Sequence, residues 1–155
     1  MHEQYEKSFK SQSAFERATV AKSFKFGAAK ESEILDIEIS VDPLSSLVKD
    51  QDINVRRFAL ESLTAITHTL PNAVRSQANI VQDAANGMTK IDPSLIKEVD
   101  LGPFKHKVDD GIVIRKAAFA LLDTMVERIP ERVNTGQATE IAIHGLDDTA
   151  EECMI

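Results

Sequence analysis

The chain has 155 residues, of which 43% are apolar and 28% charged, a balance typical of one folded domain. Its net charge of -7 argues against non-specific nucleic-acid binding, and no apolar run approaches the ~18 residues that a membrane span needs. One cysteine, Cys153, and four scattered histidines give neither an internal disulfide nor zinc-ligand spacing, so we expect no metal and no cofactor. We therefore expect an intracellular protein, of the cytoplasm and nucleus, whose partner is another protein.

Three stretches share one pattern along the chain. They read SAFERATVAKSF (13–24), DINVRRFALESL (52–63) and GIVIRKAAFALL (111–122). Each begins with a cap-like or turn residue, has arginine four places later, and then carries apolar residues at helical spacing. We predict three helices whose buried faces hold Val20, Phe24, Val55, Phe58, Ala59, Leu63, Ile66, Leu70, Ile114, Ala118, Leu121, Leu122, Met125 and Ile129.

Further helices are predicted between these three. The ranges are 37–49, interrupted at Pro43, then 72–90 after Pro71, and 135–146 after Pro130. Helix starts are marked by Ser13 with Glu16 in capping-box spacing, by Asp52, and by Asp110 before Gly111.

The repeated arginines set a period. Arg17 and Arg56 are 39 residues apart, close to the ~40 to 47 residues of a HEAT or armadillo unit. Arg56 and Arg115 are 59 apart, so about 20 extra residues are inserted between them. We predict an all-α, armadillo-like HEAT-repeat solenoid fragment of antiparallel helix pairs with an inserted β-hairpin. Its units are about 1–29, 30–70, 71–129 with the hairpin at 96–109, and an incomplete 130–155, as in a piece of a longer array or a truncated product.

The inserted stretch EVDLGPFKHKVDDG (98–111) predicts the hairpin. Gly102 and Pro103 suit the two central positions of a type II′ turn, because glycine supplies the positive φ required first. Leu101 then faces Phe104, Asp100 faces Lys105, Val99 faces His106 and Glu98 faces Lys107. One face carries two opposite-charge pairs, and the other carries Val99, Leu101, Phe104 and His106. The ribbon either folds back onto its own helices or projects up to ~20 Å into another protein.

The remaining polar residues indicate structure rather than catalysis. Arg17, Arg56 and Arg115 are expected to bond to a carboxylate or carbonyl of a neighbouring repeat, and Asp109-Asp110 and Asp147-Asp148 to complement helix dipoles. His68 and His144 are expected at the surface or in satisfied packing positions. Because no nucleophile-elbow, zinc-protease or phosphate-loop motif occurs, we expect no enzyme, and an unrecognised catalytic site is left only as a remote alternative.

The block EVDLGPFKHKVDDG, with NVRR before it and IRKAAF after it, resembles the C-terminal HEAT repeats of the cullin-associated, neddylation-dissociated (CAND) proteins. The resemblance extends from about Ser11 to Gly145. It implies a solenoid that wraps the cullin–RING core of ubiquitin ligases and whose C-terminal hairpin competes with the substrate-adaptor module.

By the same resemblance, the residues expected to bind the N-terminal, adaptor-binding region of a cullin are Val99, Leu101, Gly102, Pro103, Phe104, Lys105, His106, Lys107 and Val108. The implied function is non-catalytic assembly and adaptor exchange of SCF and other cullin–RING ligases. One alternative is a structural subunit, or truncated product, that docks end-on to the remainder of a CAND solenoid and completes it without binding a cullin on its own.

Overall fold

Helices make up most of this chain, as the repeated patterns predict. A computed structural model describes residues 2–28, 34–102 and 104–146, with the backbone alone at 2–4, 34–36, 101, 104 and 146. In chain order the helices and strands are α1 (His2–Phe9), α2 (Ala14–Ala28), α3 (Ile34–Leu47), α4 (Ile53–Thr69), α5 (Pro71–Arg75), α6 (Ala78–Met88), the 3-10 helix η1 (Pro93–Leu95), β1 (Ile96–Leu101), β2 (Phe104–Asp109), α7 (Ile112–Arg128), the 3-10 helix η2 (Pro130–Arg132) and α8 (Thr135–Leu146).

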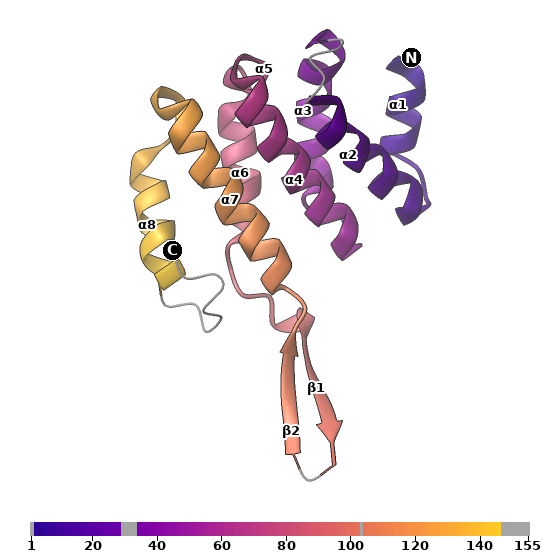
Figure 1. Ribbon diagram of the computed structural model, residues 1–155, viewed down its shortest axis with the longest axis vertical. Coiled ribbons are helices and arrows are strands. Elements are labelled where there is room, and N and C mark those ends of the chain that lie inside the picture. Colours follow the sequence, from indigo (N-terminus) through magenta and orange to yellow (C-terminus); the bar gives the residue numbers. More distant parts are fainter. Residues whose placement is uncertain (1, 29–33, 103, 147–155) are drawn as a thin grey trace.

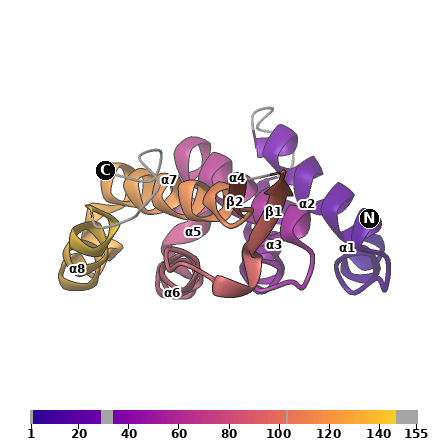
Figure 2. The same cartoon turned by 90° about the horizontal axis from the view of Figure 1, so that it is seen from below.

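The helices form two layers. α2, α4 and α7 lie side by side in the first layer, and α1, α3, α6 and α8 lie in the second (Figure 2). Within the first layer, α4 packs between α2 and α7. Each first-layer helix also packs against the second-layer helix that precedes it in the chain, α1 against α2, α3 against α4 and α6 against α7. The predicted all-α HEAT-type solenoid with an inserted hairpin is confirmed, whereas its exact division into units stays a prediction.

The core lies between the two layers and follows the predicted apolar spacing. All six residues predicted for the buried face of α7 are buried, as are Val20 and Phe24 of α2. In α4, Val55, Ala59, Leu63 and Ile66 are buried, whereas Phe58 and Leu70 are only partly covered. The centre of the Phe58 ring lies 5.3 Å from the ammonium nitrogen of Lys22. The Phe58 ring therefore makes a cation–π contact with Lys22 and also packs against the core.

The repeated arginine Arg17 joins α2 to the start of α4. Its Nε and second terminal nitrogen donate to the two carboxylate oxygens of Asp50 at 2.7 and 2.9 Å. Burial raises the pKa of Asp50, but the hydrogen bonds from Arg17 and the Asp52 amide outweigh it, so the pKa lies below its ordinary value. Arg56 donates to the Gln51 carbonyl at 3.4 Å. The partner predicted for Arg17 in a neighbouring repeat is confirmed, whereas the prediction is wrong for Arg56, whose carbonyl partner lies only five residues before it in the same predicted unit.

Asp52 caps α4, as predicted. Its carboxylate accepts from the amides of Asn54 at 2.8 Å and Val55 at 3.1 Å. Asp52→Ala should lower the free energy of unfolding by about 1 kcal/mol, because two helix-start amides lose their acceptor. Urea denaturation followed by circular dichroism measures the change. The control is Asp123→Ala on the exposed side of α7, which should stay within about 0.5 kcal/mol of the parent chain. An equal loss from both substitutions would contradict the capping role.

Two predicted helix boundaries are wrong. α3 runs through Pro43 without interruption. Proline costs a helix one amide donor, but the buried side chains of Val41, Leu44 and Val48 on both sides of Pro43 keep the segment packed on the core. The helix predicted over 72–90 is instead two helices, α5 and α6, separated at Ser76 and Gln77. Gln77 has φ -116° and ψ 13°, outside the helical region, while its side-chain amide donates to the Glu38 carbonyl at 3.3 Å.

Two further predictions at helix starts need correction. Asp110 is not the N-cap of α7, because Gly111 occupies that position. Asp110 instead pairs with Lys97. At α2, the Glu16 amide donates to Ser13 Oγ at 3.4 Å, whereas the Glu16 carboxylate accepts from Ser11 Oγ rather than completing the capping box with Ser13. The helix α1 had no counterpart among the predicted helices.

Candidate functional site

The hairpin has the register that its sequence predicts. The paired residues are Ile96 with Asp109, Lys97 with Val108, Glu98 with Lys107, Val99 with His106, Asp100 with Lys105, and Leu101 with Phe104. Gly102 has φ +75°, the positive value that the first central position of a type II′ turn requires. Pro103 lies outside the described residues. The four predicted cross-strand pairs are therefore confirmed.

One face of the hairpin is mainly apolar, with His106 opposite Val99 and Lys97 opposite Val108 near the base. Val99 and Val108 are 41% and 39% exposed on this face. His106, directly opposite Val99, is exposed too. Backbone alternation puts Leu101 and Phe104 on the same face, nearest the turn; their side chains are outside the described part of the chain. Branched apolar side chains that stay this exposed on a two-stranded ribbon leave surface for a partner to cover.

The other face is charged, but its described ion pair runs diagonally. Lys105 Nζ lies 3.7 Å from Glu98 Oε2, although Lys105 directly faces Asp100. Long side chains on a ribbon can reach their diagonal neighbours. Lys105 can therefore pair with Glu98, whose side chain is longer than that of the directly opposite Asp100. The four residues of the two predicted charge pairs, Glu98, Asp100, Lys105 and Lys107, are all exposed. Such solvated pairs contribute little to stability, so these charges remain available to another protein.

The hairpin projects away from the helices. Figure 1 shows β1 and β2 extending beyond the end of α7, and the strands pack chiefly against each other. Each strand has six residues, which gives a reach of about 20 Å. Of the two alternatives open at the sequence level, the described residues favour projection over folding back onto the core.

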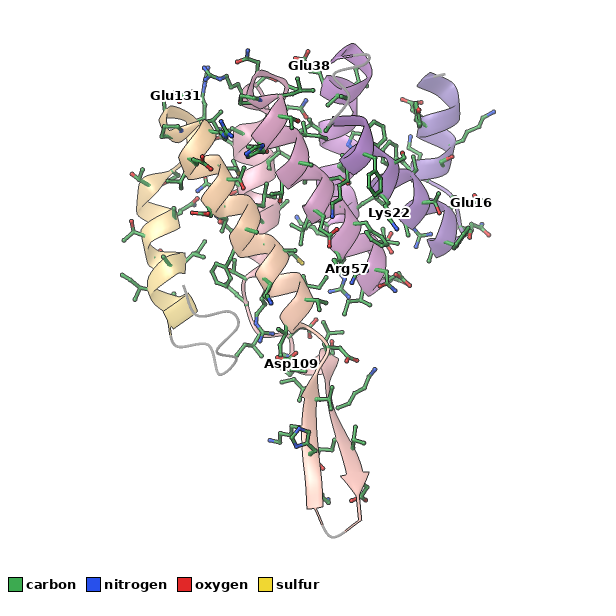
Figure 3. The ribbon with its side chains drawn as sticks, viewed as in Figure 1. Glu16, Lys22, Glu38, Arg57, Asp109 and Glu131 are labelled. Carbon is green, nitrogen blue, oxygen red and sulfur yellow. The ribbon has the colours of Figure 1, made fainter. Side chains whose placement is uncertain are left out.

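A buried ion pair fixes the base of the hairpin. Asp109 ends β2 at the junction with α7 (Figure 3), and its Oδ2 lies 2.9 Å from a terminal nitrogen of Arg115. The Arg115 side chain is only 1% exposed. Asp109 Oδ1 also accepts from the Gly111 amide at 2.8 Å, and a Cβ on Gly111 would approach that oxygen to 3.0 Å. These contacts tie the orientation of the ribbon to the first turn of α7.

The strand that enters the hairpin is held as well. Asp92 begins η1, and its carboxylate accepts from the hydroxyl of Ser94 at 2.6 Å and from the Ser94 amide at 3.0 Å. These two bonds hold the pKa of Asp92 below its ordinary value. The Asp110 amide then donates to the Leu95 carbonyl at 3.0 Å, which closes the base of the ribbon. Lys97 and Asp110 add an exposed ion pair across it.

The sequence missed the role of Asp109 and Arg115 in positioning the hairpin. Arg115 was expected to bond to a neighbouring repeat, but its described carboxylate partner is the last residue of the inserted hairpin itself. Asp109 was assigned to the helix dipole of α7, whereas it pairs with a buried guanidinium. The sequence feature that could have revealed this pair is the insertion itself. A long inserted ribbon needs a fixed base, and Arg115 is the repeated arginine nearest to that base.

The other polar residues discussed here, in the described part of the chain, do not come together in one site. His68 Nε2 lies 2.7 Å from a terminal nitrogen of Arg128 at the surface. His144 and Lys90 border a groove of about 430 Å³ that is otherwise lined mainly by apolar or uncharged residues. Residues 2–28, 34–102 and 104–146 contain no group of three or more metal-ligating side chains. Within the same ranges, every helix is too short or too polar to cross a bilayer.

Comparison with known proteins places these features in a family. The family described as "TATA-binding protein interacting (TIP20)" matches residues 73–155, more than half of the chain and the part that contains the hairpin. "Cullin-associated NEDD8-dissociated protein 1" of Dictyostelium discoideum is 40% identical over 142 residues, which cover 90% of this chain and 12% of that protein. The protein of the same name from Arabidopsis thaliana is 41% identical over 127 residues, which cover 80% of this chain and 10% of the relative.

A further relative is named as one part of such a protein. "Cullin-associated NEDD8-dissociated protein 1, C-terminal part" of Emericella nidulans is 30% identical over 138 residues, 85% of this chain and 13% of the relative. The chain thus spans about a tenth to an eighth of the length of these relatives.

Proposed function

This chain belongs to the CAND family of cullin-associated, NEDD8-dissociated proteins, and from that premise we propose that it binds a cullin without catalysing a reaction. Its role is the assembly of cullin–RING ubiquitin ligases and the exchange of their substrate adaptors. The observation that carries the proposal is the projecting hairpin, whose apolar face is exposed and whose base is fixed.

The hairpin acts by occupying the adaptor site at the N-terminal region of the cullin. Val99 and Val108 supply exposed apolar surface, and by register Leu101 and Phe104 extend that surface toward the tip. Burying such side chains against a partner contributes roughly 25 cal/mol per Å² of apolar area. His106 lies on this same face, and Lys105 and Lys107 on the opposite face offer polar contacts at the edges of the ribbon.

A fixed ribbon binds better than a mobile one. The Asp109–Arg115 pair and the Asp110–Leu95 backbone bond hold both strands at their base. Ordering a mobile loop on binding costs free energy because the loop loses conformational entropy. A ribbon already held in its bound orientation loses less of this entropy when it binds. An adaptor that competes for the same cullin surface is then displaced through overlap with the hairpin.

Deleting Glu98 to Val108 should weaken binding to an unmodified cullin at least tenfold, because the apolar tip and its flanking charges are lost together. A pull-down with purified cullin measures this loss, and added substrate adaptor should displace the parent chain. A second variant, Val99→Ser, keeps the ribbon and should also bind more weakly. Its matched control is Val126→Ser on α7, which is similarly exposed at 46% and should bind as the parent does. Equal binding by the deletion and the parent would refute the role of the hairpin.

A second candidate function is structural. The Emericella nidulans relative carries the words "C-terminal part" in its name. Phe15 and Phe26 are exposed aromatic residues on α2, which lies apart from the hairpin in Figure 1. These observations favour a chain that docks end-on to the rest of a CAND solenoid. This function is compatible with cullin binding.

A further inference from the structure

A pocket lies where α1, α2 and α3 meet. It has a volume of about 220 Å³, and its lining includes the aromatic side chains Tyr5, Phe9 and Phe24. The stacked rings of Phe9 and Phe24 have centroids 5.6 Å apart, and the Tyr5 ring is tilted against Phe24 at 5.3 Å. Phe9 and Phe24 are buried whereas Tyr5 is half-buried, so the aromatic lining extends from the core toward solvent. Aromatic rings attract cations at their faces.

Two carboxylates border the same pocket. Glu6 of α1 and Asp42 of α3 are both exposed, and both belong to its lining. Neither carboxylate has a hydrogen bond or an ion pair with another residue in the described part of the chain. The described lining also contains no lysine, arginine or histidine. The pocket therefore combines aromatic rings with uncompensated negative charge, and this combination is complementary to a cation.

Pro43 makes a backbone acceptor available in the same pocket. It lies within α3 and has no amide hydrogen, so the Ile39 carbonyl lacks the donor that a helix normally supplies four residues later. Both residues line the pocket, and Ile39 is 40% exposed. A donor on a ligand can take the place of the missing amide. The proline that α3 tolerates thus adds a third acceptor to the two carboxylates.

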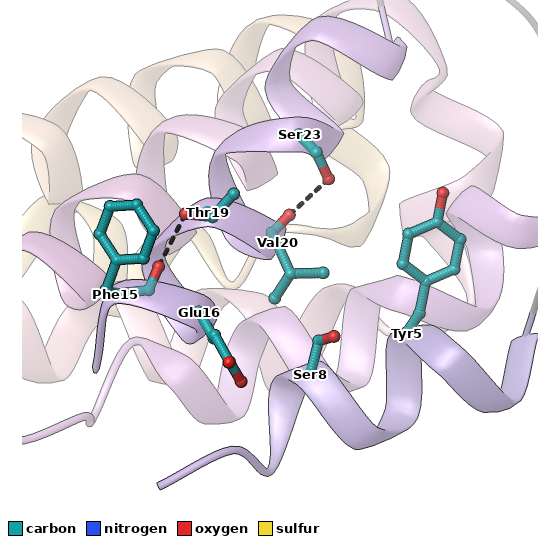
Figure 4. A pocket seen from close by; sticks show the side chains of 7 residues that line it. All are labelled: Tyr5, Ser8, Phe15, Glu16, Thr19, Val20 and Ser23. Carbon is teal, nitrogen blue, oxygen red and sulfur yellow. Dashed lines mark hydrogen bonds between the residues drawn. The ribbon is translucent and has the colours of Figure 1, made fainter. Parts of the chain in front are cut away.

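The larger groove between α1 and α2 lacks this arrangement of charge. It has a volume of about 400 Å³, and Figure 4 shows Tyr5 and Phe15 at opposite ends of it. The carboxylate in its described lining belongs to Glu16 and already accepts from the Ser11 hydroxyl. Both hollows contain aromatic rings, but unpaired carboxylates are found only in the described lining of the smaller pocket. Charge complementarity therefore selects that pocket as the cation site.

We propose that the pocket between α1 and α3 binds a lysine side chain presented by a partner protein. The methylene stem packs against the apolar surfaces of Ile39 and Pro43, and the ammonium lies against the Tyr5 ring. A lysine ammonium has three donors, which match the carboxylates of Glu6 and Asp42 and the Ile39 carbonyl.

The chemistry of the pocket distinguishes lysine from related cations. A trimethylated lysine keeps its charge but has no donor for the three acceptors, and a guanidinium is a broad planar group rather than a compact charge. The hairpin contributes no residue to the described lining, so this inference does not rest on the proposed cullin binding.

The test titrates the complete chain with a short blocked peptide that has lysine at its centre and glycine on both sides. Amide signals of α1 and α3 around the pocket should shift in the NMR spectrum, and those of the hairpin and α8 should not. A peptide with norleucine in place of lysine keeps the stem without the ammonium, and it should bind about fivefold more weakly. A trimethyllysine peptide should also bind more weakly than lysine, because it donates no hydrogen bond.

Variants of the chain locate the site. Glu6→Gln/Asp42→Asn should weaken binding of the lysine peptide about fivefold, since each exposed ion pair contributes modestly and two are lost. Tyr5→Leu keeps apolar contact but loses the cation–π interaction, and should weaken binding about threefold. The matched control Glu38→Gln/Glu140→Gln removes the same charge at exposed positions outside the pocket, and it should bind as the parent chain does.

Each other outcome overturns the inference. Equal binding of the norleucine peptide would show that the pocket recognises apolar surface alone, and tighter binding of the trimethyllysine peptide would make its ligand a quaternary ammonium. Absent shifts, equal binding by the carboxylate variant, or shifts confined to the groove of Figure 4 would show that lysine does not occupy this pocket. Deletion of the hairpin, which tests the cullin proposal, should leave lysine binding unchanged. Circular dichroism shows that the substitutions have not unfolded the chain.

Discussion

Leu63→Ala should lower the free energy of unfolding by about 3 kcal/mol, within the range measured for leucine truncation in packed cores. Leu63 is fully buried in α4. That helix packs against α2 on one side, α7 on the other, and α3 beneath it. Because stability in a repeat array is carried by interfaces between neighbours, a cavity in the central helix weakens more than one interface. Urea denaturation followed by circular dichroism measures the shift in midpoint.

The control for Leu63 is Val126→Ala on α7. Val126 is 46% exposed, so its truncation creates no closed cavity and should change the free energy of unfolding by less than about 0.5 kcal/mol. A drop at Leu63 no larger than that at Val126 would contradict the assignment of α4 as the centre of the core. Deletion of the projecting hairpin should also affect unfolding far less than Leu63→Ala, because the ribbon packs chiefly on itself.

The hairpin could be predicted in detail because its determinants are local. A glycine with positive φ sets the turn, and the turn then fixes the pairing of Glu98, Val99, Asp100 and Leu101 with their partners. The helical spacing of apolar residues likewise located the buried face of α7. Both signals lie within a few residues of what they determine.

Features that depend on contacts between distant residues could not be predicted. Pro43 stays within α3 because the helix is packed against the core on both sides of it, and Gln77 separates α5 from α6 while bonding to the Glu38 carbonyl. The diagonal pair of Lys105 and Glu98 depends on side-chain length rather than on strand register. Local propensity does not predict the continuity of α3 or the break between α5 and α6, because tertiary packing decides both.

Asp109→Ala should lower the free energy of unfolding by about 3 kcal/mol and loosen the hairpin against α7. The substitution leaves the guanidinium of Arg115, 1% exposed, without the carboxylate 2.9 Å away. Removing one partner of a buried pair is strongly destabilising, and the 18% exposure of Asp109 places the loss at the low end of the usual range. The Gly111 amide loses its acceptor as well. Urea denaturation measures stability, and hydrogen exchange in the hairpin measures the loss of fixed orientation.

The neighbouring aspartate provides the control. Asp110→Asn removes a pair with Lys97 whose side chains are 39% and 67% exposed, so it should cost less than about 1 kcal/mol. Equal losses at Asp109 and Asp110 would contradict the difference between a buried and an exposed pair.

A double variant that removes both charges distinguishes the contribution of the ion pair from that of the packing around it. In the double variant Asp109→Ala/Arg115→Met no charge is left buried, so the loss should be smaller than the sum of the two single losses by about 1 to 2 kcal/mol. If the double variant regains stability but still binds the cullin weakly, the pair serves mainly to orient the hairpin. Strictly additive losses would mean that Asp109 and Arg115 act independently, and the base of the hairpin would then be held by the Asp110–Leu95 backbone bond and the Gly111 turn instead.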